Sequence, residues 1–301
     1  MEAPGRAVGS SPSRPVLGAA LIIGAASLWG SLGIFGRLAF DHGVPAVDVA
    51  STRAFLAFLG ILPVALLRRR PLQRLRPQPG DLPLLLGYGA VGIGVFYFVY
   101  LAAIEALPVA VAAALLYTAP AWVVAIAWIM GWEPVRPRRL IPLSLVLAGA
   151  FLVTGAFRDL TAAGLLGLGA GLASGASYAI FTVLGKRIRG RYDVVTTFVF
   201  AYGAGAAVLA VVAPPWRPLL EYPEALGVLL LMAAGPTLLA VILFYVGIRF
   251  IEASTASMLA TIEPVVAALL ALAWLGESLS LSIVTGTALI ITAAWMLRPR
   301  Q

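Results

Sequence analysis

Residues 248–277 read IRFIEASTASMLATIEPVVAALLALAWLGE, and this stretch decides the fold. From Ser254 to Leu275 it is apolar over about 20 residues, the length that a helix needs to cross a bilayer. Glu263 interrupts the run near its middle. A charged side chain at that depth costs about 2.5–3.5 kcal/mol on insertion scales, so an intramembrane carboxyl indicates a functional site.

Similar apolar stretches recur along the whole chain. They are continuous and do not alternate with polar residues, which favours helices over the strands of a barrel. The sequence therefore predicts an all-α membrane protein with ten transmembrane helices. The expected spans are 16–36, 47–67, 83–104, 109–130, 140–157, 164–185, 194–213, 225–248, 254–275 and 279–297.

The composition supports a membrane protein. Of the 301 residues, 61% are hydrophobic and 11% are charged, whereas a soluble domain carries about 25% charged residues. The net charge of +8 does not indicate nucleic-acid binding, because the basic residues cluster between apolar stretches. There is no cysteine, and the single histidine, His42, falls in an expected loop, so neither a metal site nor another cofactor is predicted. Residues 1–15 are polar and are expected to form a disordered cytoplasmic tail.

The distribution of lysine and arginine predicts the orientation. With both termini placed in the cytoplasm, 17 of the 21 basic residues fall in cytoplasmic loops. Only Arg37, Arg158 and Arg217 fall outside, and Arg53 lies within a span. A wrong number of spans would destroy this alternation between loops rich in basic residues and loops poor in them. The positive-inside rule thus supports ten spans in a bacterial inner membrane, with cytoplasmic N- and C-termini.

The two halves of the chain align with each other. Residues 48–52 (DVAST) match residues 193–197 (DVVTT) at an offset of 145, and Pro120 matches Pro264 at an offset of 144. Glu133 likewise corresponds to Glu277. This predicts two five-helix repeats, at residues 16–160 and 161–301. Because five is an odd number, the second repeat must be inverted, as in many secondary carriers.

These features resemble the drug/metabolite transporter superfamily and, within it, the EamA family. The likeness rests on Trp29-Gly30, on residues 100–133 and on residues 248–277, and so covers both halves. It implies transport of small metabolites, with amino acids prominent, and is greatest to bacterial exporters of amino acids, including aromatic ones. In one departure, the first half has Thr118-Ala119-Pro120 where the second has Ile262-Glu263-Pro264. The carboxyl is therefore present only once.

Candidate substrate-binding residues are aromatic or polar side chains expected at mid-membrane depth, where Trp and Tyr need a hydrogen-bond partner or a ligand. They are Trp29, Tyr97, Tyr117, Thr118, Ser177, Tyr178, Thr237, Thr261 and Glu263. Three prolines are expected to break helices beside a cavity, since each frees a backbone carbonyl: Pro120, Pro236 and Pro264. Tyr100 and Tyr245 lie nearer span ends and rank lower. For Arg53 two interpretations stay open: snorkelling to the outer surface, or pairing with a substrate carboxylate.

The function expected is a secondary transporter that moves amino acids or analogues outward by alternating access through a central cavity. Its partners are a small-molecule substrate and the lipid bilayer, and a monomer is compatible with the sequence. Efflux of cationic drugs is the alternative, with Glu263 facing the cation. An intramembrane enzyme is the alternative from another class, but the spans lack a nucleophile–base pair or a carboxylate dyad. A channel would need a charged ring or several chains.

Overall fold

The computed structural model describes residues 14–67, 75–107, 109–155, 164–275 and 280–297. Most of the expected tail, the boundary at residue 160 and Glu277 lie outside these ranges. All elements in the described part of the chain are helical.

Ten helical spans follow one another, and several consist of consecutive shorter helices. The spans of the first half are α1 (Arg14–Gly30) with α2 (Leu32–Asp41); α3 (Ala46–Leu66); α5 (Leu82–Gly89), η1 (Ala90–Val95) and α6 (Phe96–Ala106); α7 (Val109–Leu116) with α8 (Ala119–Ile129); and η2 (Pro137–Arg139) with α9 (Leu140–Thr154). Those of the second half are α10 (Leu165–Ile188); α11 (Val194–Ala210); α13 (Leu226–Met232), η6 (Ala233–Leu239) and α14 (Ala240–Gly247); α15 (Ala253–Ala260) with α16 (Glu263–Leu275); and α17 (Leu281–Met296). Two short helices, α12 (Arg217–Glu221) and η5 (Pro223–Ala225), precede α13.

Eight spans are long and apolar enough to cross a membrane, while α11 and α17 are shorter apolar helices. The predicted ten transmembrane helices are thus confirmed. The expected end of the first span at residue 36 was too early, because α2 continues to Asp41. A charged residue such as Arg37 does not stop a helix. Gly43 does: its φ of 82° and a bond from Val44 N to Ala39 O form a C-terminal cap.

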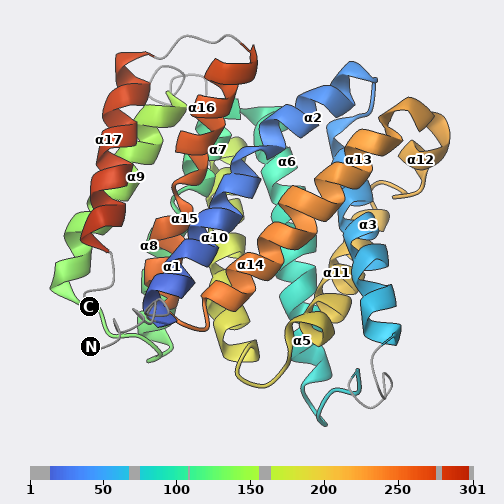
Figure 1. The fold of residues 1–301 in the computed structure, drawn as a ribbon, viewed down its shortest axis with the longest axis horizontal. Coiled ribbons are helices and arrows are strands. Elements are labelled where there is room, and N and C mark those ends of the chain that lie inside the picture. The colour runs from blue at the N-terminus through green and yellow to red at the C-terminus, as the bar shows by residue number, and fades with distance from the viewer. Residues whose placement is uncertain (1–13, 68–74, 108, 156–163, 276–279, 298–301) are drawn as a thin grey trace, which may run out of the picture.

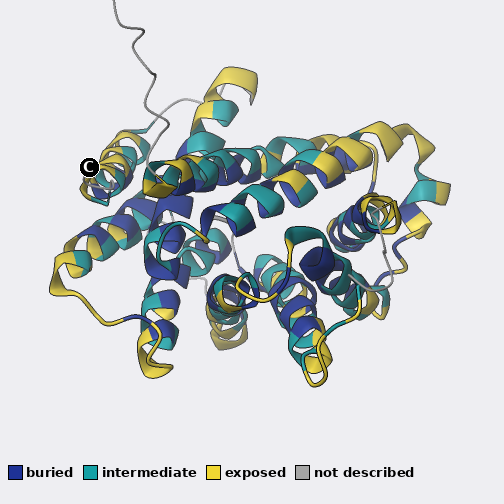
Figure 2. Ribbon diagram, turned by 60° about the horizontal axis from the view of Figure 1, so that its bottom comes forward, coloured by how far each residue is buried: buried dark blue, intermediate teal, exposed yellow. Residues whose placement is uncertain are grey.

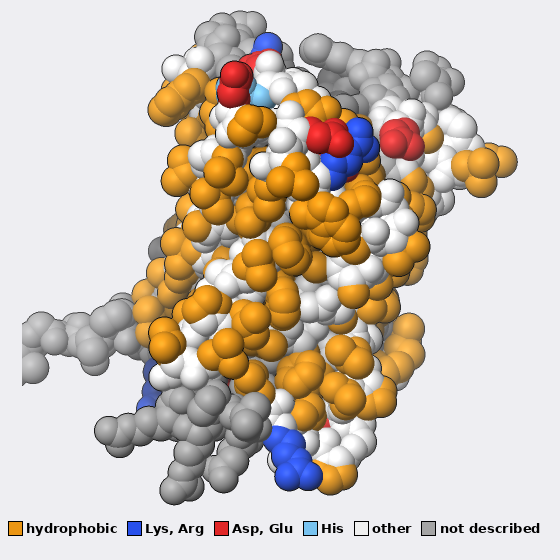
Figure 3. All heavy atoms as spheres, turned by 90° about the vertical axis from the view of Figure 1, so that its right-hand side faces the viewer, with side chains coloured by type: hydrophobic (Ala, Val, Ile, Leu, Met, Phe, Trp, Pro, Cys, Tyr) orange, Lys and Arg blue, Asp and Glu red, His pale blue; other side chains and the backbone are white. Residues whose placement is uncertain are grey.

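The outside of the molecule is apolar. Figure 3 shows a broad hydrophobic band, with charged side chains gathered at the two ends. Large side chains such as Trp128, Leu231 and Trp274 are 60%, 62% and 73% exposed. Exposed apolar surface of this extent would be unusual on a soluble monomer, and it matches a lipid-facing surface.

The two halves interlock. In the first half, α1 packs against α14, α15 and α16 of the second; in the second half, α10 packs against α6, α7 and α8 of the first. Each half thus inserts its first helix beside the third and fourth spans of the other. Helices α9 and α17 lie side by side at one edge, and α1 begins at the same end of the molecule at which α17 ends (Figure 1). Buried residues occupy the faces turned toward other helices, and exposed residues gather in loops and on outer faces (Figure 2).

Each half departs from regular helix at matching places. The third and eighth spans contain the π-helical segments η1 and η6, and the fourth and ninth spans break between α7 and α8 and between α15 and α16. Pro120 and Pro264 lie in the first turn after these breaks, and Pro236 lies inside η6. In a membrane, such irregular backbone is tolerated where protein or a polar site satisfies it. The breaks and π-helices therefore bring irregular backbone from both halves to mid-depth.

Glycines allow the closest helix contacts. The row Gly167, Gly171 and Gly175 on α10 faces Leu107, Leu115 and the end of α7, as expected from its four-residue spacing. Between α9 and α17, a Cβ on Gly149 would lie 2.8 Å from the carbonyl oxygen of Gly286. The α9–α17 contact thus depends on the absence of a side chain at both glycines.

Candidate functional site

The two helix breaks are joined by a polar contact. Glu263 is the first residue of α16, directly after the break that follows α15. The hydroxyl of Tyr117, which lies in the α7–α8 break, is close enough to interact with the Glu263 carboxyl. Two residues expected to bind substrate are thus brought together from opposite halves.

An aromatic cluster lies beside this contact. Trp29 is 8% exposed and packs edge-on against Tyr178, with ring centres 5.9 Å apart and an interplanar angle of 78°. Phe244 lies 5.3 Å from Trp29, and Phe96 lies 6.1 Å from Tyr178. A Cβ on Gly30, next to Trp29, would lie 2.9 Å from the backbone oxygen of Glu263. Rings from four spans, which contain α1, α6, α10 and α14, therefore gather next to Glu263.

Arg53 points toward the same centre and not to the outer surface. Its guanidinium carbon lies 4.1 Å from the centre of the Tyr97 ring, a cation–π contact. Its charge interacts with Glu263 and with Tyr100. Snorkelling, one of the two interpretations of Arg53, does not describe this placement. The site therefore contains a cation from the first half and a carboxyl from the second.

Several buried polar side-chain atoms have no hydrogen-bond partner in the described part of the chain. They include the Tyr178 hydroxyl, Thr237 Oγ1, Ser257 Oγ and Arg53 Nε, and also the Tyr88 hydroxyl, which lies beside Gly185 near the end of α10. Buried polar groups are normally bonded, and each exception calls for an explanation. For Tyr178 and Arg53, a polar ligand in the site would supply the missing partner.

The hydroxyls of the other expected binding residues are buried or bonded to nearby backbone, and among the residues that the structure describes no hydrogen bond joins them to Glu263. The Thr118 hydroxyl bonds to Leu115 O at 2.6 Å and packs against Gly175, and the Thr261 hydroxyl bonds to Ser257 O at 3.2 Å. Ser177 is buried on α10. Thr237 is buried in η6, where its carbonyl accepts from Tyr202 at 3.0 Å. The hydroxyls of Thr118 and Thr261 thus donate hydrogen bonds to backbone carbonyl oxygens at the helix breaks. Tyr117 and Glu263 form the polar contact between the two breaks.

Three residues of the site were missed or ranked low: Tyr100, Phe96 and Phe244. Tyr100 follows Tyr97 by one helical turn on α6, stacks on Phe96 at 6.1 Å and interacts with the charge of Glu263. In the sequence, its spacing of three residues from Tyr97 indicates that both side chains lie on the same face of the helix. Phe244 carries no polar group, and nothing in its apolar stretch distinguishes it from lipid-facing neighbours.

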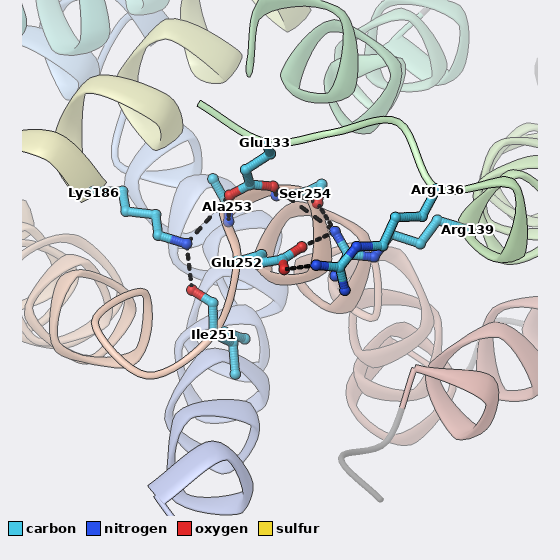
Figure 4. Close-up of polar contacts among 8 residues, drawn as sticks. All are labelled: Glu133, Arg136, Arg139, Lys186, Ile251, Glu252, Ala253 and Ser254. Atoms are coloured by element: carbon cyan, nitrogen blue, oxygen red, sulfur yellow. Dashed lines mark hydrogen bonds and ion pairs between the residues drawn. The ribbon is translucent and has the colours of Figure 1, made fainter. Parts of the chain in front are cut away.

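A second polar network joins the halves at the end of the molecule where α1 begins and α17 ends (Figure 1), and Figure 4 shows its residues. Glu133, after α8, accepts bonds from Ala253 N at 2.7 Å, from Ser254 N at 3.3 Å and from Ser254 Oγ at 2.7 Å. Lys186 at the end of α10 donates to Glu133 at 3.2 Å and to Ile251 O at 2.9 Å. A first-half carboxylate therefore caps the N-terminus of second-half helix α15.

Arginines extend this network. Arg139 donates to Ser254 Oγ at 2.8 Å and pairs with Glu252, which also pairs with Arg136 at 3.3 Å (Figure 4). Burial alone would raise the pKa of Glu133. However, the Ser254 hydroxyl, the Lys186 charge and the two backbone amides together outweigh burial and hold that pKa below its ordinary value. Glu133 is therefore stabilised in its ionised form.

The central arrangement is suited to binding. It offers one carboxyl, one guanidinium, phenol hydroxyls and aromatic faces, which can hold a small molecule by both charge and stacking. Within the ranges that the structure describes, no group of three His, Cys, Asp or Glu side chains could hold a metal ion.

Comparisons with known proteins agree with this architecture. The EamA-like transporter family matches residues 16–155 and 165–298, one copy in each half. An uncharacterized transporter of Archaeoglobus fulgidus is 32% identical over 285 residues, which covers 92% of this chain and 96% of that protein. A protein of known crystal structure shares the fold, with a TM-score of 0.74 at 21% identity, over 95% of this chain and 96% of that one. The chain belongs to the EamA-like transporter family and is a secondary transporter, not an enzyme.

Proposed function

We propose that this transporter moves amino acids or their analogues outward across a bacterial inner membrane. One observation carries the proposal. Arg53 from the first half lies over the ring of Tyr97, whose centre is 5.3 Å from that of Phe96 in the aromatic cluster, and Glu263 from the second half lies against Gly30, next to Trp29 of the same cluster. An amino acid carries a carboxylate and an ammonium group at once. Arg53 would bind the carboxylate, and Glu263 with Tyr117 would bind the ammonium group.

The rings favour a substrate with an apolar or aromatic side chain. Trp29, Tyr178 and Phe244 present faces and edges within contact distance of each other, and apolar groups bind well against such surfaces. A purely cationic drug is a poorer match, because the Arg53 charge would repel it. Binding of the whole zwitterion uses every charged group of the site.

Alternating access is the proposed mechanism. The site is built from both inverted halves, so a rocking motion of one half against the other would expose it to each side in turn. The network around Glu133 links the halves at one end and would have to open during each cycle. We infer that this end faces the cytoplasm, with both termini, because the basic residues gather in its loops. Reporter fusions at the two termini check this orientation, which a periplasmic terminus would refute.

The experiment is transport in liposomes that contain the purified protein. Wild-type protein is expected to move labelled amino acids, with aromatic ones among the best. Glu263→Gln and Arg53→Gln should each lower the rate about tenfold or more, since a bond to a charged group contributes about 1.5–3 kcal/mol. The same assay over a pH series tests whether Glu263 carries a proton, because Glu263→Gln would then abolish the pH dependence.

Matched controls separate the site from general damage. Glu105→Gln removes an exposed carboxyl on α6, and Arg37→Gln removes an exposed cation on α2. Both should transport like the wild type. Movement of a cationic dye without movement of any amino acid would refute the substrate class. Wild-type rates in both site variants would refute the site itself.

A further inference from the structure

A hollow of about 350 Å³ lies where α10 and α14 end. Lys186, Arg189 and Gly190 from the end of α10 line it, together with Ile248 and Arg249 from the end of α14. Three of these five residues are cations and none is an acid. The hollow is therefore basic, with Arg189 and Arg249 adding to Lys186, which is paired with Glu133.

The basic residues at the end of α10 have different partners. Lys186 bonds to Glu133, Arg191 pairs with Asp81 at 2.9 Å, and Arg187 lies 4.7 Å from the centre of the Trp132 ring. Arg189 has only a distant ring contact, 5.6 Å from the centre of Tyr245, and its buried Nε has no hydrogen-bond partner in the described part of the chain. A buried guanidinium nitrogen without an acceptor indicates a place for an anionic ligand.

Helix ends alone do not account for these arginines. Cations often sit at helix C-termini, where they offset the exposed carbonyl groups. Here the last carbonyl of each helix already has a backbone donor: Arg191 N donates to Ile188 O at 2.8 Å, and Phe250 N donates to Gly247 O at 3.0 Å. Arg249 is exposed beside Arg189 in the wall of the hollow. Arg249 has a distant ring contact of its own, 5.8 Å from the centre of Phe250. Among the described residues, neither arginine forms an ion pair with an acidic side chain, so both guanidinium groups lack an anionic partner.

We propose that this hollow binds a phosphate-type oxyanion, supplied either by the headgroup of an anionic phospholipid or as free phosphate. Arginine suits such a ligand, because its planar fork donates two parallel bonds to a phosphate. Lys186 would share its ammonium group between Glu133 and the anion. The hollow lies at an end of the transmembrane spans, where headgroups of the inner leaflet are within reach if this end is cytoplasmic.

The test counts bound lipid by native mass spectrometry of the full chain in a neutral detergent. Phosphatidylglycerol should remain bound in preference to phosphatidylcholine. Arg189→Gln and Arg249→Gln should each lower retained phosphatidylglycerol about tenfold, as expected for the loss of a charged hydrogen bond. The matched control is Arg138→Gln, which removes an exposed cation from the same end and should retain lipid like the wild type.

A second arm separates the two sources of phosphate. Displacement of phosphatidylglycerol by millimolar inorganic phosphate would identify a site that accepts the free anion. Retention of the lipid would identify the headgroup of a phospholipid as the ligand. Arg189→Lys keeps the charge and should restore at least part of the binding, which distinguishes lost recognition from misfolding. Equal retention of phosphatidylglycerol by Arg189→Gln, Arg138→Gln and the wild type would overturn the proposal.

Discussion

Glu133 is buried against the start of α15, where two backbone amides, the Ser254 hydroxyl and Lys186 surround its carboxylate. In the sequence, the match between Glu133 and Glu277 indicated that a glutamate recurs at this position of both halves. It did not indicate what the side chain of Glu133 contacts. The donor groups belong to residues that lie 53 and about 120 positions further along the chain than Glu133. Only the fold shows that they meet its carboxylate. A single carboxylate can thus join segments that local sequence does not relate.

Replacement of this carboxylate should lower stability in a pH-dependent way. The pKa of Glu133 is lowered in the folded protein, so its stabilisation is fully present above the ordinary value near 4.5 and is lost as pH falls through the folded pKa. Glu133→Gln should therefore lower the thermal unfolding temperature at pH 7, by an amount equivalent to about 1–3 kcal/mol. As pH falls below 4.5 and through the folded pKa, the difference from wild type should shrink.

Thermal unfolding in detergent between pH 3 and pH 8 measures this effect. Glu221→Gln is the control, because Glu221 is 51% exposed and its ion pair with Arg217 contributes little. A constant difference between Glu133→Gln and wild type at every pH would show that the ionised carboxylate is not what stabilises this end.

Central side chains divide into those that sequence identified and those that it did not. Glu263 and Tyr117 stood out because polar groups are costly in a bilayer, and the structure brings them together. For Arg53 the sequence left two interpretations open, because from its position on α3 the side chain can extend either to the outer surface or toward the centre of the membrane. Its partner, the Tyr97 ring, belongs to another span, and only packing selects between the two directions.

At the scale of helices, the prolines predicted the breaks in the fourth and ninth spans, because proline removes a backbone donor. Pro236 also lies in an irregular segment, the π-helix η6. Its counterpart η1 contains no proline, and the glycines at 92 and 94 gave only a weak signal for it. There, Gly92 and Gly94 fit against Phe181 and Val208 of the second half. Backbone irregularity of this kind follows from tertiary contacts and is not encoded locally.

The α9–α17 contact should be sensitive to side-chain volume. A Cβ on Gly149 would lie 2.7 Å from Ile290 and 2.8 Å from the Gly286 oxygen, so the helices must separate to accept it. Gly149→Ala should destabilise the protein by about 1–3 kcal/mol, the usual cost of overpacking. Chemical denaturation in mixed micelles measures the change.

Gly169→Ala is the matched control, since an added Cβ there meets no atom within 4 Å. It should be neutral or raise stability by about 0.5–1 kcal/mol, because alanine favours helix more than glycine does. Equal stability for Gly149→Ala and Gly169→Ala would contradict the close contact between α9 and α17.

At the scale of the molecule, the number of spans and their all-helical nature followed from apolar lengths, and the family match over both halves supports the inverted repeat. What the repeat could not predict is the interlocking of the halves. Helices α1 and α10 each insert among the spans of the opposite half. This exchange creates the site at the junction, because each half contributes one charged group to it.

The central claim is that Glu263 borders a site that water and substrate reach between the halves. Because the chain has no cysteine, Thr261→Cys places a single thiol two residues before Glu263. Labelling of reconstituted protein with a membrane-impermeant thiol reagent is the decisive measurement. We expect this thiol to react, and a transported amino acid to slow the reaction, whereas Leu269→Cys, 51% exposed on the surface of α16, stays unreactive under lipid. An unreactive thiol at position 261 in a protein that still transports, or a reaction that no substrate slows, would contradict the account.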